Sequence, residues 1–217
     1  MRALFQWGAG LVATTVMVAI SFQWLDRPIA LFAHSQAGRS HHGIWVGLTH
    51  IPDPLIPLAV VAFVVLGLRA LLGKAMSRHH AAALVGSVSV IVAETTKDQL
   101  KFIFGRTWPE TWIHNNPSFI HDGVYGFHFL HGGEAYDSFP SGHMTATCAV
   151  ISVIWLWYPH LRWLCAIAAL AVATGLVGAN YHFLSDVIGG AFVGVSVGWM
   201  TTAIWNLIVA SGVRSAG

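Results

Sequence analysis

Long apolar runs separated by shorter polar segments make up most of the chain. A transmembrane helix needs about 20 predominantly apolar residues. Six segments come near that length: Trp7–Trp24, Pro54–Leu72, Ala81–Phe104, His143–Tyr158, Trp163–Ala179 and Leu184–Val209. The pattern therefore predicts an all-α, polytopic membrane protein built as a bundle of six transmembrane helices. No internal repeat, low-complexity segment or interdomain linker interrupts it, which favours a single membrane-embedded domain over residues 1–217.

One long polar segment separates the third predicted span from the fourth. It runs from about Gly105 to Gly142 and is rich in histidine and glycine. Loops longer than about 12–15 residues are usually functional or disordered. Its tryptophans and phenylalanines favour the depth of a membrane–water interface. We expect this loop either to cover a substrate site or to anchor the bundle at the interface.

The composition supports the membrane assignment. Hydrophobic residues make up 55% of the chain, charged residues only 9%, and the mean hydropathy is +0.64, whereas a soluble domain carries about 25% charged residues. The net charge of +2 is too small to indicate nucleic-acid binding. Two cysteines, Cys148 and Cys165, lie within apolar runs and give no disulfide framework. The lipid bilayer is the partner that the composition indicates, and the oligomeric state is left open.

Charged residues divide unevenly between the two sides of the predicted bundle. With the N-terminus inside, the inner segments contain six basic residues and no acid: Arg2, Arg69, Lys74, Arg78, Arg162 and Arg214. An excess of Lys and Arg marks the cytoplasmic side. Both termini are therefore predicted to be cytoplasmic, in a bacterial inner membrane, with the long loop on the periplasmic or exterior face.

The first polar cluster lies at the outer end of the third span. Glu94, Lys97, Asp98 and Lys101 fall on one stripe of a helix. Intramembrane charges usually face a bundle interior or a wet cavity. We expect the first three to neutralise one another. Lys101 is followed closely by Gly105 and Arg106, which together offer two cations and a turn to an anion.

The second cluster is Pro-Ser-Gly-His, residues 140–143, at the start of the fourth span. A helix N-terminus presents unpaired N–H groups and a positive dipole end, so it is suited to bind an anion. Gly142 allows a ligand to approach the backbone closely. His143 can donate or accept a proton near neutral pH. An ordinary Ser141 N-cap explains part of this pattern equally well.

The third cluster contains His182 and Asp186, four residues apart. On a helix the carboxylate would hold the imidazole in one tautomer, as in hydrolytic triads. The alternative is a buried pair that only satisfies itself. With the other clusters on the same membrane face, the set fits phosphoryl transfer, which needs cations, N–H donors, a nucleophile and a proton donor. No ligand set for a metal stands out, so the expected route needs no metal or cofactor and passes through a phosphohistidine.

These residues resemble the type 2 phosphatidic acid phosphatase superfamily, whose motifs are Lys-x6-Arg-Pro, Pro-Ser-Gly-His and Ser-Arg-x5-His-x3-Asp. The order of the motifs and their places at the ends of spans three to six agree. The resemblance implies that His182 is the nucleophile, Asp186 its orienting partner and His143 the general acid. It also implies that Lys101, Ser141 and Gly142 bind phosphate.

The sequence departs from the family pattern at two arginines. Trp108 stands where the arginine of the first motif is expected, and Gly175-Leu176 stand where the Ser-Arg pair is expected. Charge-assisted hydrogen bonds are the strong ones, so a replacement is predicted. Arg106 is the first candidate for phosphate binding, and the others are Asn180, His114, His121, His128 and His131.

The leading hypothesis is a metal-independent phosphatase acting on a membrane lipid: undecaprenyl diphosphate, phosphatidylglycerophosphate, phosphatidic acid or a lipid A phosphate. A lipid phosphotransferase would use the same site. Two other classes stay open, a serine protease using Ser141 with His182 and an ion-coupled carrier using the Glu94 stripe. The four loop histidines also permit a zinc site.

Overall fold

The fold is helical throughout the part of the chain that the structure describes. The structure is a computed structural model, and it describes residues 2–36, 42–112 and 114–215. Apart from isolated β-bridges, these residues form no strand. The helices are α1 (Arg2–Ile20), a π-helical turn (Ser21–Leu25), α2 (Asp26–Gln36), α3 (His42–Thr49), α4 (Leu55–Leu71), α5 (Arg78–Phe104), α6 (Phe119–Asp122), α7 (Gly142–Trp157), α8 (Arg162–Gly178) and α9 (Leu184–Ser215), with two 3₁₀ turns at Glu134–Tyr136 and Pro159–Leu161.

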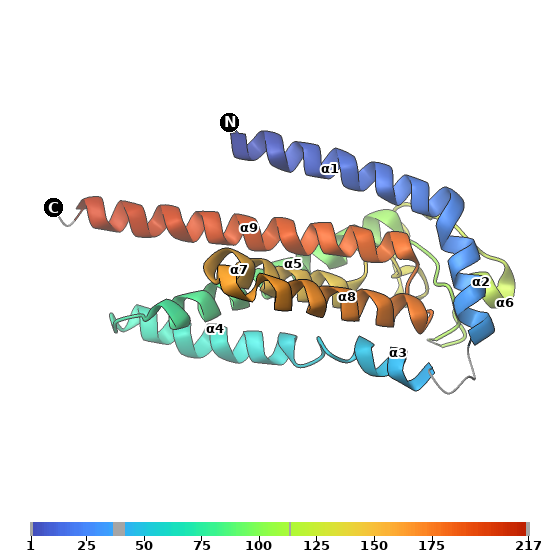
Figure 1. Ribbon diagram of the computed structural model, residues 1–217, viewed down its shortest axis with the longest axis horizontal. Helices are drawn as coiled ribbons and strands as arrows, with labels where there is room; N and C mark the ends of the chain where they lie inside the picture. Colours follow the sequence, from blue (N-terminus) through green and yellow to red (C-terminus); the bar gives the residue numbers. More distant parts are fainter. Residues whose placement is uncertain (1, 37–41, 113, 216–217) are drawn as a thin grey trace.

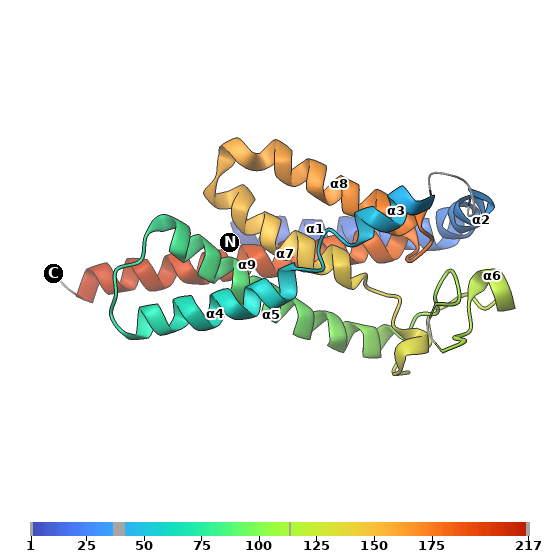
Figure 2. The ribbon, with the colours of Figure 1, turned by 90° about the horizontal axis from the view of Figure 1, so that it is seen from below.

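Each of the six predicted apolar segments is helical, in α1, α4, α5, α7, α8 and α9. These helices run along the length of an elongated bundle (Figures 1 and 2). Within the described residues, three helical stretches are long and apolar enough to cross a membrane: Ala3–Gln36, Pro159–Gly178 and Leu184–Ser211. Leu55–Leu71 and Gly142–Trp157 are shorter apolar helices, and α5 carries the charged stripe in its second half.

The first helical stretch is longer than predicted and it bends. The π-helical turn Ser21–Leu25 follows α1, and from there α2 turns across the end of the bundle (Figure 1). π-turns within helices are often found at functional sites and at bends. This turn brings Asp26, the first residue of α2, to full burial in the interior. The sequence pattern predicted neither α2 nor α3, because both are short and stand in segments assigned to a loop.

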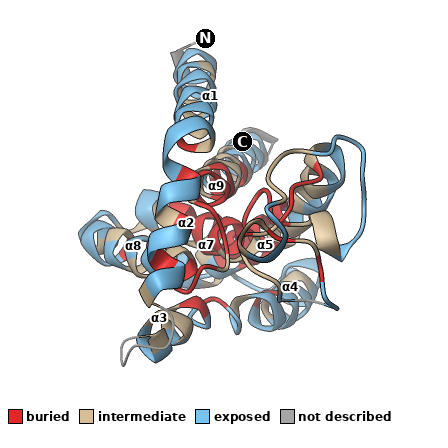
Figure 3. Ribbon diagram, turned by 90° about the vertical axis from the view of Figure 1, so that its right-hand side faces the viewer, coloured by how far each residue is buried: buried red, intermediate tan, exposed pale blue. Residues whose placement is uncertain are grey.

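The core lies where α5, α7 and α9 meet, and α1 is mostly exposed (Figure 3). Small residues let α9 lie against α7. Gly190, Gly194 and Gly198 recur every four residues, and a Cβ atom built at any of them would collide with a backbone carbonyl oxygen of α7 or of its N-cap residue Ser141. Small residues allow such close backbone approach between membrane helices. The start of α7 and the start of α9 are therefore held together at one end of the bundle.

The segment from Gly105 to Ser141 folds over that same end. It begins with Gly105, which ends α5 in the left-handed conformation (φ 52°) and donates its N–H to the Lys101 carbonyl at 2.8 Å. A Cβ atom at Gly105 would also collide with the carbonyl of His128. The sequence predicted a turn here that offers Arg106 to an anion together with Lys101. The turn in the structure is tight, favours glycine and directs Arg106 into the interior.

Candidate active site

A polar cleft of about 560 Å³ opens at the end of the bundle that the long loop covers. Three of the motifs predicted from the sequence meet in it, because Lys101, Gly142, His143 and His182 all line its wall. The other lining residues are Pro52, Asp53, Ile56, Glu94, Lys97, Trp108, Trp112, Ala146 and Tyr181. These residues come from the α3–α4 connection, α4, α5, the long loop, α7 and the α8–α9 connection.

His182 lies in the short connection between α8 and α9. The chain turns at Asn180 (φ 59°), and the next two N–H groups, of Tyr181 and His182, both donate to the carbonyl of Leu176. The side chain of His182 is only 5% exposed. Burial lowers the pKa of its imidazole, and the nearby carboxylate of Asp186 offsets this only in part. Burial thus favours the neutral form of His182.

Asp186 faces Nδ1 of His182, with Oδ2 at 3.6 Å. That separation is longer than a hydrogen bond, although catalytic contacts in ligand-free sites are often long. Ser138 completes the contact: its hydroxyl donates to Oδ2 at 2.7 Å and lies 3.5 Å from His182 Nδ1. The backbone N–H of Phe183 also donates to Oδ2, at 2.9 Å. With Nδ1 facing this group, Nε2 of His182 is the nitrogen left for the cleft.

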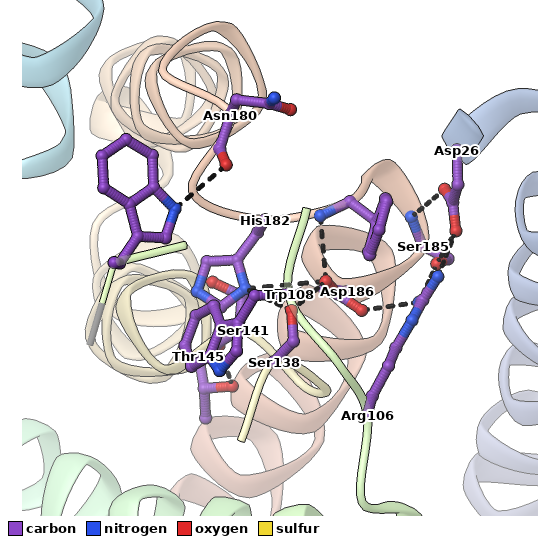
Figure 4. A network of polar contacts seen from close by, with 12 residues as sticks. Asp26, Arg106, Trp108, Ser138, Ser141, Thr145, Asn180, His182, Ser185 and Asp186 are labelled. Atoms are coloured by element: carbon purple, nitrogen blue, oxygen red, sulfur yellow. Dashed lines mark hydrogen bonds and ion pairs between the residues drawn. The ribbon is translucent and has the colours of Figure 1, made fainter. Parts of the chain in front are cut away.

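Arg106 does not line the cleft, and this corrects the prediction that it binds phosphate. Its side chain is 0% exposed, and it forms ion pairs of 2.6 Å with both Asp26 and Asp186. Figure 4 shows it on the opposite side of Asp186 from His182. The reason is the Gly105 turn, which directs the guanidinium inward, behind the His–Asp pair. A phosphate in the cleft cannot reach a guanidinium whose charge two carboxylates already neutralise.

The guanidinium of Arg106 is also enclosed by aromatic rings. Its central carbon lies 4.5–5.4 Å from the ring centres of Phe22, Tyr125, Phe127 and Phe183. Burial alone lowers the pKa of Arg106, but Asp186 and Asp26 more than reverse this and raise it. Burial raises the pKa of Tyr125 in turn. Its hydroxyl therefore stays protonated, 3.2 Å from Asp26 and 2.6 Å from the Phe22 carbonyl.

The start of α7 has the features of an anion site. Ser141 is its N-cap residue but makes no capping hydrogen bond through its side chain. Its Oγ is buried and has no hydrogen-bond partner among the described residues. The Ser141 N–H donates to the Asp186 carbonyl at 3.1 Å, which ties this helix start to the His–Asp pair. An unpartnered buried hydroxyl beside free helical N–H groups is suited to a ligand that accepts hydrogen bonds.

The two lysines in the cleft differ in their partners. Lys97 forms ion pairs with Glu94 at 2.6 Å and Asp98 at 3.2 Å, the mutual neutralisation that we predicted. Lys101 forms no ion pair or hydrogen bond with the residues that the structure describes, and its ammonium lies 5.9 Å from the centre of the Trp108 ring. Lys101 is thus the cation available to a ligand.

His143 also contacts a carboxylate. Its Nε2 lies 3.3 Å from Oδ1 of Asp53, a residue of the α3–α4 connection. The sequence analysis did not single out Asp53. Asp53 stands between two prolines in the outer connection before α4, and no spacing rule relates that connection to Pro-Ser-Gly-His.

Aromatic and apolar residues occupy the positions of the two missing arginines. The Trp108 ring lies 5.1 Å from the His182 ring, and its Nε1 donates to the Glu134 carbonyl at 2.8 Å. Leu176 is fully buried in an apolar cluster with Val172 and Val187. Neither position holds a polar replacement. Trp108 instead forms, with Trp112 and Tyr181, an aromatic side of the cleft.

The other candidates for replacing these arginines lie outside the cleft lining. The Asn180 amide donates to Glu110 at 3.3 Å. His114 pairs with Glu134, and the rings of His128 and His131 pack on Tyr136. Over the described ranges, no group of three or more His, Cys, Asp or Glu residues is arranged to hold a metal ion.

The sequence analysis missed Ser138, Ser185 and Asp26 as parts of the site. Ser138 stands only three residues before Ser141, so nearness to the motif was an available signal. Asp26 accepts from the Ser185 N–H at 3.0 Å and from its hydroxyl at 2.5 Å. The only indication of Asp26 in the sequence was that an acidic residue stands at the end of the first apolar segment.

Comparisons with known proteins identify a family and a fold. Residues 80–209 match the sequence model of the PAP2 superfamily. A lipid A 1-phosphatase of Rhizobium johnstonii is 35% identical over 92 residues, covering 41% of this chain and 37% of the relative. A lipid A 1-phosphatase of Rhizobium etli is 36% identical over 88 residues, covering 39% and 36%. The alignments thus span little more than a third of the length of these curated relatives.

A solved structure has the same fold. The crystal structure of a transmembrane PAP2-type phosphatidylglycerolphosphate phosphatase from Bacillus subtilis superposes with a TM-score of 0.55. The match covers 94% of this chain and 98% of that one, at 17% sequence identity. At this identity the likeness concerns the fold.

Proposed function

The chain belongs to the PAP2 superfamily, and on that premise we propose that it is a membrane lipid phosphatase that works through a phosphohistidine on His182. One observation carries the proposal. His182, buried and backed by Asp186, shares a cleft with the unpaired Lys101, the start of α7 and His143. A nucleophile, an anion cradle and a proton donor are the groups that phosphate ester cleavage requires.

The proposed reaction has two steps. Nε2 of His182 attacks phosphorus, the bond from phosphorus to the leaving oxygen breaks, and His143 gives that oxygen a proton. Water then attacks phosphorus and passes a proton to His143, and the bond from phosphorus to Nε2 of His182 breaks. This step releases inorganic phosphate and restores both histidines. Lys101, the Ser141 hydroxyl and the N–H of Gly142 hold the non-bridging oxygens. Asp186 keeps Nδ1 of His182 turned away from the cleft, and Arg106 holds Asp186 from behind.

Two of the alternatives find little support in the geometry. A serine protease needs a hydrogen bond between its nucleophile and base, and the Ser141 hydroxyl has none among the described residues. An ion-coupled carrier would need Glu94, Lys97 and Asp98 as a binding site, but Lys97 already pairs with both carboxylates.

Within the lipid phosphates, we propose a sugar-linked phosphate of the lipid A type as the first substrate to test. The two curated relatives are named lipid A 1-phosphatases. The aromatic side of the cleft, formed by Trp108, Trp112 and Tyr181, also offers flat apolar surfaces to a sugar ring. Phosphatidylglycerophosphate, phosphatidic acid and undecaprenyl diphosphate are the comparison substrates.

The test is phosphate release by the purified protein from these four lipids. We expect His182→Ala to lower the rate by about 10³-fold or more, as loss of a catalytic nucleophile does. Acid-labile phosphate should be trapped on the wild type but not on this variant. The matched control is His160→Ala, which changes a histidine outside the cleft lining.

Activity should survive EDTA, because side chains supply the positive charge in this proposal. Near-wild-type turnover by a folded His182→Ala variant would remove the nucleophile assignment. A loss with EDTA that zinc reverses would show that the enzyme depends on a metal.

A further inference from the structure

The general acid of the proposed reaction has a carboxylate partner of its own. Asp53 Oδ1 lies 3.3 Å from Nε2 of His143, and Asp53 Oδ2 lies 2.7 Å from Nδ1 of His50. The three side chains thus form a row, His143–Asp53–His50, that leads from the cleft wall to the surface. Their side chains are 41%, 48% and 59% exposed, in that order. No residue of this row other than His143 belongs to the three sequence motifs.

The backbone around Asp53 is built to hold it in place. The N–H of Asp53 donates to the His50 carbonyl at 3.2 Å, and that of Leu55 donates to the Pro52 carbonyl at 2.9 Å. Prolines at 52 and 54 fix φ on both sides of Asp53. Pro52 and Ile56 line the cleft next to it. Asp53 is therefore presented to the cleft on a short and restrained turn.

Several charged groups lie near His143, and they show what the Asp53 carboxylate adds. From α5, Lys101 and Glu94 line the same cleft as His143 and carry opposite charges. From the α8–α9 connection, His182 shares the same cleft, and it must be neutral to attack phosphorus. Lys97 is already neutralised by Glu94 and Asp98. Among the described residues, Asp53 is the carboxylate in direct contact with His143, so it is the group placed to stabilise a second proton on that imidazole.

We propose that Asp53 is a positioning residue that keeps His143 as the imidazolium, with His50 fixing the carboxylate from the other side. This inference rests on the proposed function. In the first step the leaving oxygen takes one proton from His143, which becomes neutral. In the second step the attacking water returns a proton, and the imidazolium forms again beside Asp53. In this scheme Asp53 takes no proton and acts only as the counter-charge, as the carboxylate of a hydrolytic triad does.

The test is the Asp53→Asn variant, assayed on two phosphate esters that differ in their leaving group. A general acid contributes about 10²–10⁴-fold and matters most when the leaving oxygen is basic. We expect Asp53→Asn to slow cleavage of an alkyl phosphate about tenfold or more, and of p-nitrophenyl phosphate much less. The alkaline limb of the kcat/KM profile should move to lower pH, because the imidazolium has lost its counter-charge. Asp53→Glu should restore part of the rate on the alkyl phosphate and move the alkaline limb part of the way back.

The matched control is Glu134→Gln, which breaks another His–carboxylate contact, that of Glu134 with His114 at 3.2 Å, outside the cleft. Glu134→Gln should leave the rates on both esters and the pH profile of kcat/KM unchanged. Equal losses on both esters, or an unmoved alkaline limb, would overturn the role of Asp53 while leaving the phosphatase intact. If the wild type itself releases no phosphate from either ester or from the lipids, the proposed function fails and this inference with it.

Discussion

Arg106 is bound by two carboxylates that lie far away in the sequence. Asp26 precedes it by 80 residues and Asp186 follows it by 80. A buried ion pair is costly to form, and removing one partner leaves an unpaired charge that costs about 3–5 kcal/mol. The position of Arg106 between these carboxylates makes it a part of the scaffold that orients Asp186, and hence His182.

We expect Arg106→Lys to lower both the thermal unfolding temperature and kcat, with little change in the inhibition constant of inorganic phosphate. A lysine offers a single charged point and cannot bridge both carboxylates as the planar guanidinium does. Thermal unfolding in detergent and phosphate inhibition measure the two effects separately.

The comparison variant is Lys101→Met. It should weaken phosphate binding and leave the unfolding temperature nearly unchanged, because Lys101 has no ion pair to lose among the described residues. If Arg106→Lys instead keeps its stability and binds phosphate poorly, Arg106 is a phosphate ligand after all.

Short spacings explain which site residues were visible in the sequence. Lys101, the 140–143 motif, and His182 with Asp186 are local patterns that helical geometry makes interpretable. The partners of Arg106 were not visible, since no local rule relates it to Asp26. Nearness to Lys101 in the sequence predicts Arg106 as a phosphate ligand. What separates the two side chains is the tight turn at Gly105, where the carbonyl of His128 leaves no room for a Cβ atom, and no local rule relates Gly105 to His128.

At the scale of elements, the packing of α9 against α7 sets the distance between His182 and the start of α7. The glycine stripe brings the helices close, and the Ser141 N–H bonds to the Asp186 carbonyl at the end where both begin. A small change in this packing would therefore move His182 relative to Gly142. Displacements of about 1 Å at a catalytic site can cost about 10²-fold in rate.

We expect Gly194→Ala to destabilise the protein by about 1–3 kcal/mol, because the added methyl group overpacks the interface with α7. Its Cβ would collide with the Thr145 carbonyl. Activity should fall further than the loss of folded protein explains. Calorimetry in detergent, with rates corrected for the folded fraction, measures both.

Gly86→Ala is the control for this change. Gly86 is also a helical glycine, in α5, but nothing lies within 4 Å of the position of its added Cβ. That variant should be unchanged or more stable by up to about 1 kcal/mol. Equal behaviour of the two variants would show that the stripe does not set the packing.

The long helices were predictable because apolar length alone marks them. The sequence missed α2 and α3, which carry polar residues and are short. It also gave no sign of the π-helical turn at residues 21–25, since that turn depends on the tertiary contacts of Asp26 with Ser185 and Arg106.

For the whole molecule, we propose six membrane spans with the cleft on the exterior face and both termini in the cytoplasm. The support is the basic inner segments and the acidic outer ones. His114→Cys, in the long loop, should react with a membrane-impermeant maleimide in intact cells. Lys74→Cys, between α4 and α5, should react only after permeabilisation. The native Cys148 and Cys165 are both buried, so the background is low. The reverse labelling pattern would overturn this orientation.

The contacts of Asp26 also have a consequence for the order in which the protein is made. Its carboxylate leaves the ribosome 80 residues before Arg106 and 159 before Ser185. Until then it has neither of these partners, and an unpaired acid is costly in an apolar environment. The final packing of Asp26 at the start of α2 therefore requires the loop after α5. Chains that end before Arg106 would lack this anchor for the start of α2.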